Sequence, residues 1–111
     1  MPSLDFARKR IDETDRMIIR LIARRAGFAR LVAKIKQEGG LPLDDFKREE
    51  EIAAKWGAQA RILKLPKAET VAAMKSIMLM CKAEQKKVKG AQNAGRARKT
   101  GRKAGKNAGK R

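Results

Sequence analysis

The sequence has no histidine, no tyrosine, one cysteine (Cys81) and two serines (Ser3 and Ser76) among its 111 residues. Without an imidazole, the chain cannot form Ser-His-Asp or Cys-His catalytic arrangements, and zinc sites built from cysteine and histidine lack nearly all their ligands. A single cysteine also forms no disulfide within the chain. Most active sites that use an activated nucleophile or a zinc ion are therefore excluded.

Long apolar runs and a secretory signal peptide are absent as well. A membrane-spanning helix would need about 18 or more consecutive apolar residues. A chain with a single cysteine, and therefore without an internal disulfide, is typical of a protein in a reducing compartment. We therefore expect a soluble, cytoplasmic protein that has no membrane partner.

Acidic residues are missing from the last 26 residues, although the whole chain carries a net charge of +17. Residues 86–111 contain 11 Lys and Arg among Ala and Gly, whereas residues 1–85 contain 18 basic and 12 acidic side chains. Because Val88 is the one sizeable apolar side chain of this tail, burial cannot offset the entropy lost on ordering it. We expect a folded domain over residues 1–85 and a disordered basic tail over residues 86–111.

Apolar residues recur at steps of three and four in three segments, and no alternation typical of β-strands occurs. The first predicted helix spans residues 4–38 and ends before Gly39. The second begins after Asp44 or Asp45, either of which can cap it, and the third runs from about residue 66 to about residue 87. The pattern predicts an all-α protomer of three helices with one very long N-terminal helix.

The first predicted helix is too long for a single small globule. Its length would be about 50 Å at about 1.5 Å per residue, whereas a domain of this size has a radius of gyration of about 12 Å. Another chain must cover the excess apolar seam, and a dimer is the simplest closed assembly. We expect an intertwined homodimer.

Four polar side chains occupy positions where the helical seams require apolar ones: Arg25 and Lys36 on the first helix, Glu49 on the second and Gln85 on the third. One inward Arg or Lys can extend to solvent, and one Arg–Glu pair can be purely structural. Four polar side chains on converging helix faces instead favour a bound ligand. The single glutamate cannot neutralise both Arg25 and Lys36, so some positive charge remains uncompensated. The pattern predicts a site for a small anion.

Arg8 extends this prediction to a second chain. It lies 17 residues before Arg25 on the same helix, or about 25 Å away, which is too far to share a small ligand within one chain. In an antiparallel dimer of long helices, Arg8 of one protomer can reach the Arg25 site of the other.

The residues also match a known pattern in their order and spacing. The first helix opens with LDFARKRIDETD and continues with IIRLIARRAGFARLVAKIK; the loop and second helix read LPLDDFKREEEI; and Gln85 lies near the end of the third helix. Over residues 4–85 the chain closely resembles the all-helical class of chorismate mutases. The matching side chains are Arg8, Arg25, Lys36, Asp45, Arg48, Glu49 and Gln85, with Cys81 where the family usually has Ser.

The resemblance implies a helical dimer that rearranges chorismate to prephenate, a step of phenylalanine and tyrosine biosynthesis, without a cofactor, metal or covalent intermediate. Arg25 and the partner's Arg8 would bind the two carboxylates. Lys36 and Gln85 would donate to the ether oxygen as negative charge develops there. Glu49, helped by the backbone near Asp45, would accept from the ring hydroxyl. The resemblance also implies that Arg48 completes the positive wall.

The substitution at Cys81 weakens one expected contact. A thiol is a poorer hydrogen-bond donor than a hydroxyl, so Cys81 can contact a substrate carboxylate only weakly, or can simply pack. Nothing near it in sequence indicates an activated thiolate, and we favour packing.

Two alternative functions are open at this stage. Isochorismate–pyruvate lyases resemble the mutases, but they tend to lack the Arg-Glu pair that this chain has as Arg48 and Glu49. The basic tail also suggests a nucleic-acid-binding helical dimer, whose contact with polyanions would be non-specific and salt-dependent. The tail has no aromatic residue for base stacking. We rank both alternatives below the mutase.

Overall fold

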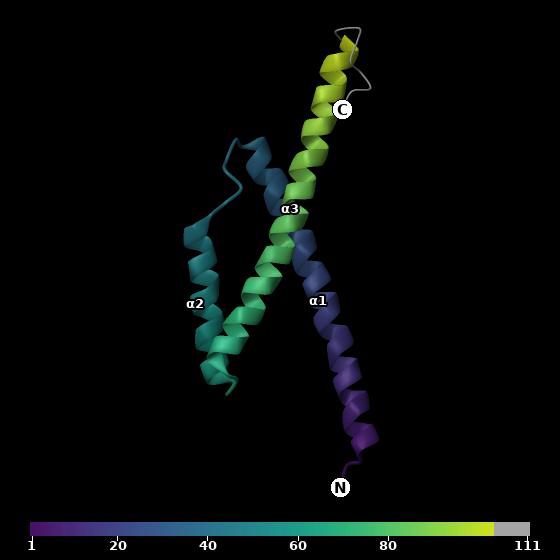
Figure 1. The fold of residues 1–111 in the computed structure, drawn as a ribbon, viewed down its shortest axis with the longest axis vertical. Helices are drawn as coiled ribbons and strands as arrows, with labels where there is room; N and C mark the ends of the chain where they lie inside the picture. Colours follow the sequence, from purple (N-terminus) through teal and green to yellow (C-terminus); the bar gives the residue numbers. More distant parts are fainter. Residues whose placement is uncertain (104–111) are drawn as a thin grey trace.

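Three α-helices make up the described part of the chain. A computed structural model describes the backbone of residues 1–103 and the side chains of residues 1–91. Helix α1 spans Leu4–Glu38, α2 spans Phe46–Ile62 and α3 spans Lys67–Lys103 (Figure 1). No strand occurs within residues 1–103, which confirms the all-α prediction. None of the helices described here is long and apolar enough to cross a bilayer.

Local signals in the sequence set the helix ends. The Ser3 hydroxyl caps α1 by accepting a 3.0 Å hydrogen bond from the backbone N–H of Phe6. Asp45, rather than Asp44, caps α2. At the end of α1, Gly40 adopts a φ of +69°, a left-handed conformation that glycine adopts without steric cost. This turn reverses the chain and brings α2 toward α3.

Helix α3 continues beyond Lys87, where the sequence placed its end, to Lys103. Ala, Lys, Arg and Gln, which dominate this stretch, are strong helix formers, and no proline interrupts it. The side chains of residues 92–103, and residues 104–111 entirely, lie outside the described part of the chain. Most of the expected disordered tail and its expected polyanion contact fall in those residues.

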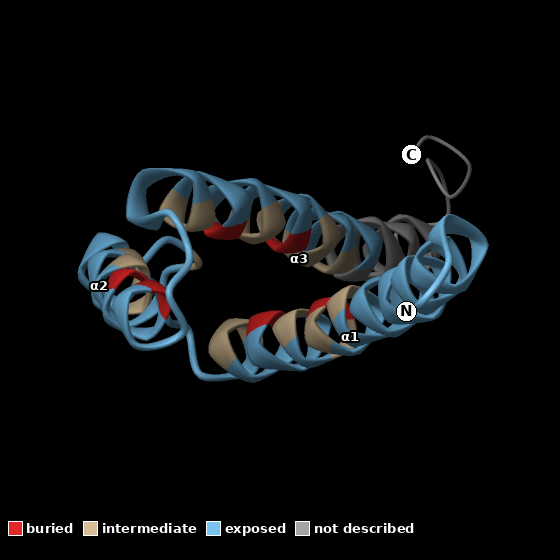
Figure 2. Cartoon of the chain, turned by 90° about the horizontal axis from the view of Figure 1, so that it is seen from below, coloured by how far each residue is buried: buried red, intermediate tan, exposed pale blue. Residues whose placement is uncertain are grey.

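Helix α3 is the centre of the protomer. Both α1 and α2 pack against α3 and not against each other; α2 runs beside it and α1 crosses it (Figure 1). The buried residues lie on the faces of the helices that are turned toward one another (Figure 2). They are mostly small, and comprise Ala26, Ala33, Ala60, Met74 and Cys81. Tight packing is also visible at Gly57, where an added Cβ would lie 3.0 Å from the Lys67 side chain.

The N-terminal half of α1 projects away from the other two helices. Every residue from Met1 to Leu21 is exposed, including the apolar seam residues Leu4, Ile11 and Ile18. The protomer measures 73 × 33 × 17 Å, with a radius of gyration of 20.1 Å, against about 13 Å for a compact chain of this length. The elongation expected from the sequence is therefore present.

Met74 is expected to contribute most to the stability of the protomer core, because its side chain is fully buried. Replacing it with alanine removes buried methylene groups and leaves a cavity. The free energy of unfolding should fall by roughly 2–5 kcal/mol, measured by urea denaturation at fixed protein concentration. Met80→Ala on the same helix is the control, since Met80 is 49% exposed. Equal losses in both variants would contradict the assignment of the core.

Candidate active site

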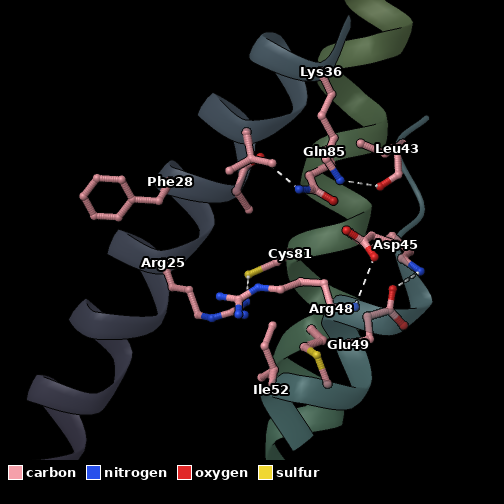
Figure 3. A pocket seen from close by; sticks show the side chains of 14 residues that line it. Arg25, Phe28, Lys36, Leu43, Asp45, Arg48, Glu49, Ile52, Cys81 and Gln85 are labelled. Carbon is pink, nitrogen blue, oxygen red and sulfur yellow. Dashed lines mark hydrogen bonds and ion pairs between the residues drawn. The ribbon is translucent and has the colours of Figure 1, made fainter. Parts of the chain in front are cut away.

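A cavity of about 290 Å³ opens between α1, α3 and the N-terminal end of α2 (Figure 3). Pockets for small molecules commonly start at about 300 Å³. All three helices and the α1–α2 loop contribute apolar side chains to its lining. These are Phe28, Ala29 and Val32 from α1, Leu43 from the loop, Ile52 from α2 and Met78 from α3. Seven of the eight expected site residues line the same cavity: Arg25, Lys36, Asp45, Arg48, Glu49, Cys81 and Gln85.

Arg25 and Lys36 bring positive charge to the α1 side of the cavity. Both side chains are half-buried. The Arg25 Nη1 donates to the Cys81 Sγ at 3.0 Å, and the Lys36 Nζ donates to the Leu43 carbonyl at 3.1 Å. Among the described residues, no carboxylate lies within ion-pair distance of either cation. Two partly desolvated cations without a carboxylate partner make the cavity favourable for an anion.

Arg48 adds a second guanidinium from the α2 side. It lies in the first turn of α2, and Figure 3 shows its side chain extending into the pocket toward Arg25. Its Nη1 is 3.8 Å from a Glu51 carboxylate oxygen, and both groups are more than half exposed. Such an exposed pair is weak, so Arg48 keeps most of its capacity to bind an anion.

Glu49 is held by Lys82, a cavity residue that the sequence reasoning missed. The Lys82 Nζ lies 2.8 Å from the Glu49 Oε2 and 3.2 Å from the Asp44 Oδ1. Hydrogen bonding to Glu49, and then to Asp44, raises the pKa of Lys82 above its ordinary value of 10.5. The stabilisation from these contacts is therefore present at neutral pH and is lost only as the pH rises through the raised pKa.

One sequence signal could have identified Lys82. It lies three residues before Gln85 and four after Met78, which places it on the same helical face as both. The many other lysines of α3 obscured this spacing, because a lysine on a charged helix usually lies in solvent.

Gln85 and Cys81 occupy the α3 side of the cavity. The Gln85 Nε2 donates to the Ala29 carbonyl at 3.1 Å, and the second hydrogen of that amide is available to a ligand. Cys81 is buried at 4% exposure, and its sulfur accepts the hydrogen bond from Arg25. In the protomer, Cys81 therefore packs in the core and also supports the Arg25 guanidinium.

Arg8 is the one expected site residue that does not line this cavity. It is exposed on the projecting half of α1. Within one protomer, Arg8 is therefore remote from Arg25, as expected from their separation of 17 residues along one helix. Its contribution to a partner's site stays a prediction.

Asp45 is expected to support the site through its helix cap. Its Oδ1 accepts a 3.1 Å hydrogen bond from the Arg48 backbone N–H. Asp45→Ala should lower the free energy of unfolding by about 1 kcal/mol, measured by urea denaturation. Asp45→Asn, which retains a capping oxygen, should lose much less. A loss in the asparagine variant as large as that in the alanine variant would contradict the capping role.

Comparison with known proteins agrees with this geometry. A family model described as chorismate mutase type II matches residues 7–86. Over 45 residues the chain is 49% identical to a chorismate mutase of Methanocaldococcus jannaschii. This alignment covers 40% of the chain and 46% of that protein, so the chain spans about half the length of the curated relative that it matches. No solved structure matches the chain. Because the family match extends over most of the chain and includes every residue of the cavity, the protein belongs to the chorismate mutase type II family.

Proposed function

We propose that the protein converts chorismate to prephenate by an intramolecular Claisen rearrangement, a step of aromatic amino-acid biosynthesis. One C–O bond breaks while one C–C bond forms, so the step needs neither a nucleophile nor a redox group. Catalysis requires a compact substrate conformer and stabilisation of the charge that separates in the transition state. A half-buried cavity with positively charged walls supports both requirements.

The observation that carries this proposal is the convergence of Arg25, Lys36 and Arg48 on one cavity. Within the described residues, Arg25 and Lys36 have no carboxylate in ion-pair range. A dianion such as chorismate would supply the missing negative charge. Arginine suits the carboxylates because its planar fork can form two parallel hydrogen bonds.

The remaining side chains have roles that follow from their chemistry. Lys36 and Gln85 would donate to the ether oxygen as negative charge develops on it. Glu49 would accept from the ring hydroxyl, helped by the backbone near Asp45. We expect Lys36 to contribute most, because a cation at a developing anion stabilises the transition state more than the ground state.

We further propose that the functional unit is a homodimer with two shared sites. The exposed apolar seam on the projecting half of α1 supports this, with Leu4 at 64%, Ile11 at 58% and Leu21 at 59% exposure. An antiparallel partner helix would cover that seam. It would also bring its Arg8 to the open side of the cavity, where a second substrate carboxylate requires a cation.

Purified protein should be incubated separately with chorismate and with isochorismate. The proposal predicts prephenate from chorismate and no salicylate or pyruvate from isochorismate. Absence of prephenate, with salicylate and pyruvate formed from isochorismate, would instead assign the cavity to the lyase reaction.

A further inference from the structure

Lys82 joins two helices at the edge of the cavity. Its Nζ contacts the Glu49 Oε2 at 2.8 Å and the Asp44 Oδ1 at 3.2 Å, and it lies 5.6 Å from the centre of the Phe46 ring. The Lys82 and Glu49 side chains are 23% and 34% exposed. The Lys82–Glu49 pair is therefore better shielded from solvent and salt than an ordinary surface ion pair, whereas Asp44 is 56% exposed and contributes less.

The arrangement of the helices makes this contact important for the site. Within the described residues, α1 and α2 both pack on α3 and do not pack on each other. The position of Glu49 relative to Arg25 and Lys36 is consequently set through α3 and through the α1–α2 loop, whose Leu43 carbonyl accepts from Lys36. Among the α3 side chains that the structure describes, Lys82 is the one that forms ion pairs with the first turn of α2 and with the residue before its cap.

The partners of Lys82 also separate it from the substrate-binding cations. Arg25 and Lys36 contact a sulfur atom and a carbonyl, whereas Lys82 already contacts two carboxylates. Its charge is thus matched inside the protein. The Glu49 Oε2 is occupied by this contact, which leaves the Oε1 to accept a hydrogen bond from a ligand.

We propose that Lys82 is a positioning residue for the reaction: it fixes the Glu49 carboxylate so that its second oxygen receives the ring hydroxyl of the substrate. Lys82 also neutralises Glu49, so that a carboxylate can lie beside a dianionic substrate without repelling it. This inference rests on the proposed mutase function and assigns to Lys82 a role through Glu49 rather than direct contact with the substrate.

The test is a double-mutant cycle on chorismate turnover with the full chain. Lys82→Met keeps a long side chain and removes the ammonium group, and should lower kcat/KM about tenfold, since small displacements of a positioned group are costly. Glu49→Gln should lower kcat/KM at least as much. In the Glu49→Gln background, adding Lys82→Met should change kcat/KM less than about twofold, because coupled residues are not additive.

Three controls keep the result interpretable. Lys86→Met removes the same charge from an exposed position of α3 and should leave kcat/KM unchanged. Lys82→Arg retains a cation and should recover most of the loss. Far-ultraviolet circular dichroism should show wild-type helicity for Lys82→Met; if it does not, Lys82→Gln, which also removes the cation, replaces it in the wild-type and Glu49→Gln backgrounds with the same expected coupling.

The outcomes separate this inference from the proposed function. A wild-type protein that does not convert chorismate would overturn the function itself. An active wild type with an unchanged Lys82→Met variant would overturn only the role of Lys82. Independent losses in the cycle, with KM raised equally in both backgrounds, would show that Lys82 binds the substrate directly and would also contradict the positioning role.

Discussion

Lys36→Ala is expected to lower kcat/KM for chorismate by roughly 10²–10³-fold, the effect of removing one preorganised donor from a site that stabilises a developing anion. The Lys36 Nζ is held by the Leu43 carbonyl at 3.1 Å, and is therefore oriented before the substrate arrives. Most of the loss should appear in kcat, because in the proposed reaction the ammonium group would interact most strongly with the transition state. Steady-state assays of prephenate formation measure both parameters.

Lys34→Ala is the matched control for that substitution. Lys34 is exposed on the same helix and does not line the cavity, so its loss changes the net charge equally without touching the site. The kcat/KM of the Lys34→Ala variant should equal that of the wild type. If Lys36→Ala retained wild-type kcat, the assignment of Lys36 would be wrong, although the family membership would stand.

Arg8→Ala should lower kcat/KM about 10- to 100-fold, the range expected for losing a charge-assisted hydrogen bond to a substrate carboxylate. Arg8 is exposed on the part of α1 that projects from the protomer, so the substitution removes no packing within one chain. The loss should appear mainly in KM, because Arg8 would bind the substrate and transition state alike.

Lys9→Ala provides the comparison, since Lys9 is an exposed neighbour on the same helix. It should retain wild-type kinetics, and both variants should sediment as dimers. An Arg8→Ala variant with unchanged KM would remove Arg8 from the site.

The helices and most of the cavity were predictable from the sequence because each depends on local signals. Glycines after residue 38 end α1, Asp45 caps α2, and the positions of Arg25 and Lys36 in an apolar seam place them at the cavity. These signals act within a few residues, where periodicity and capping chemistry are decisive. Seam positions alone located Arg25, Lys36, Glu49 and Gln85 at the cavity, and the family resemblance added Asp45, Arg48 and Cys81.

Other features were not predictable because they depend on distant contacts or on opposing weak preferences. The pairing of Lys82 with Glu49 joins two helices whose relative rotation the sequence does not specify. The end of α3 was placed too early because glycines and like charges oppose a helix there, whereas the abundant Ala, Lys and Arg favour one. Summed helix propensities decided the outcome for the backbone up to Lys103.

The shared active site is the central claim of this account, and mixing two impaired variants tests it most directly. Arg8→Ala and Lys36→Ala chains should be unfolded and refolded together, and heterodimers verified by native mass spectrometry. Each heterodimer would contain one site with both residues intact. At chorismate concentrations well below KM, random pairing should therefore restore about a quarter of the wild-type rate of prephenate formation. A mixture that contains heterodimers but is no more active than its two parents would contradict a site completed by the partner's helix.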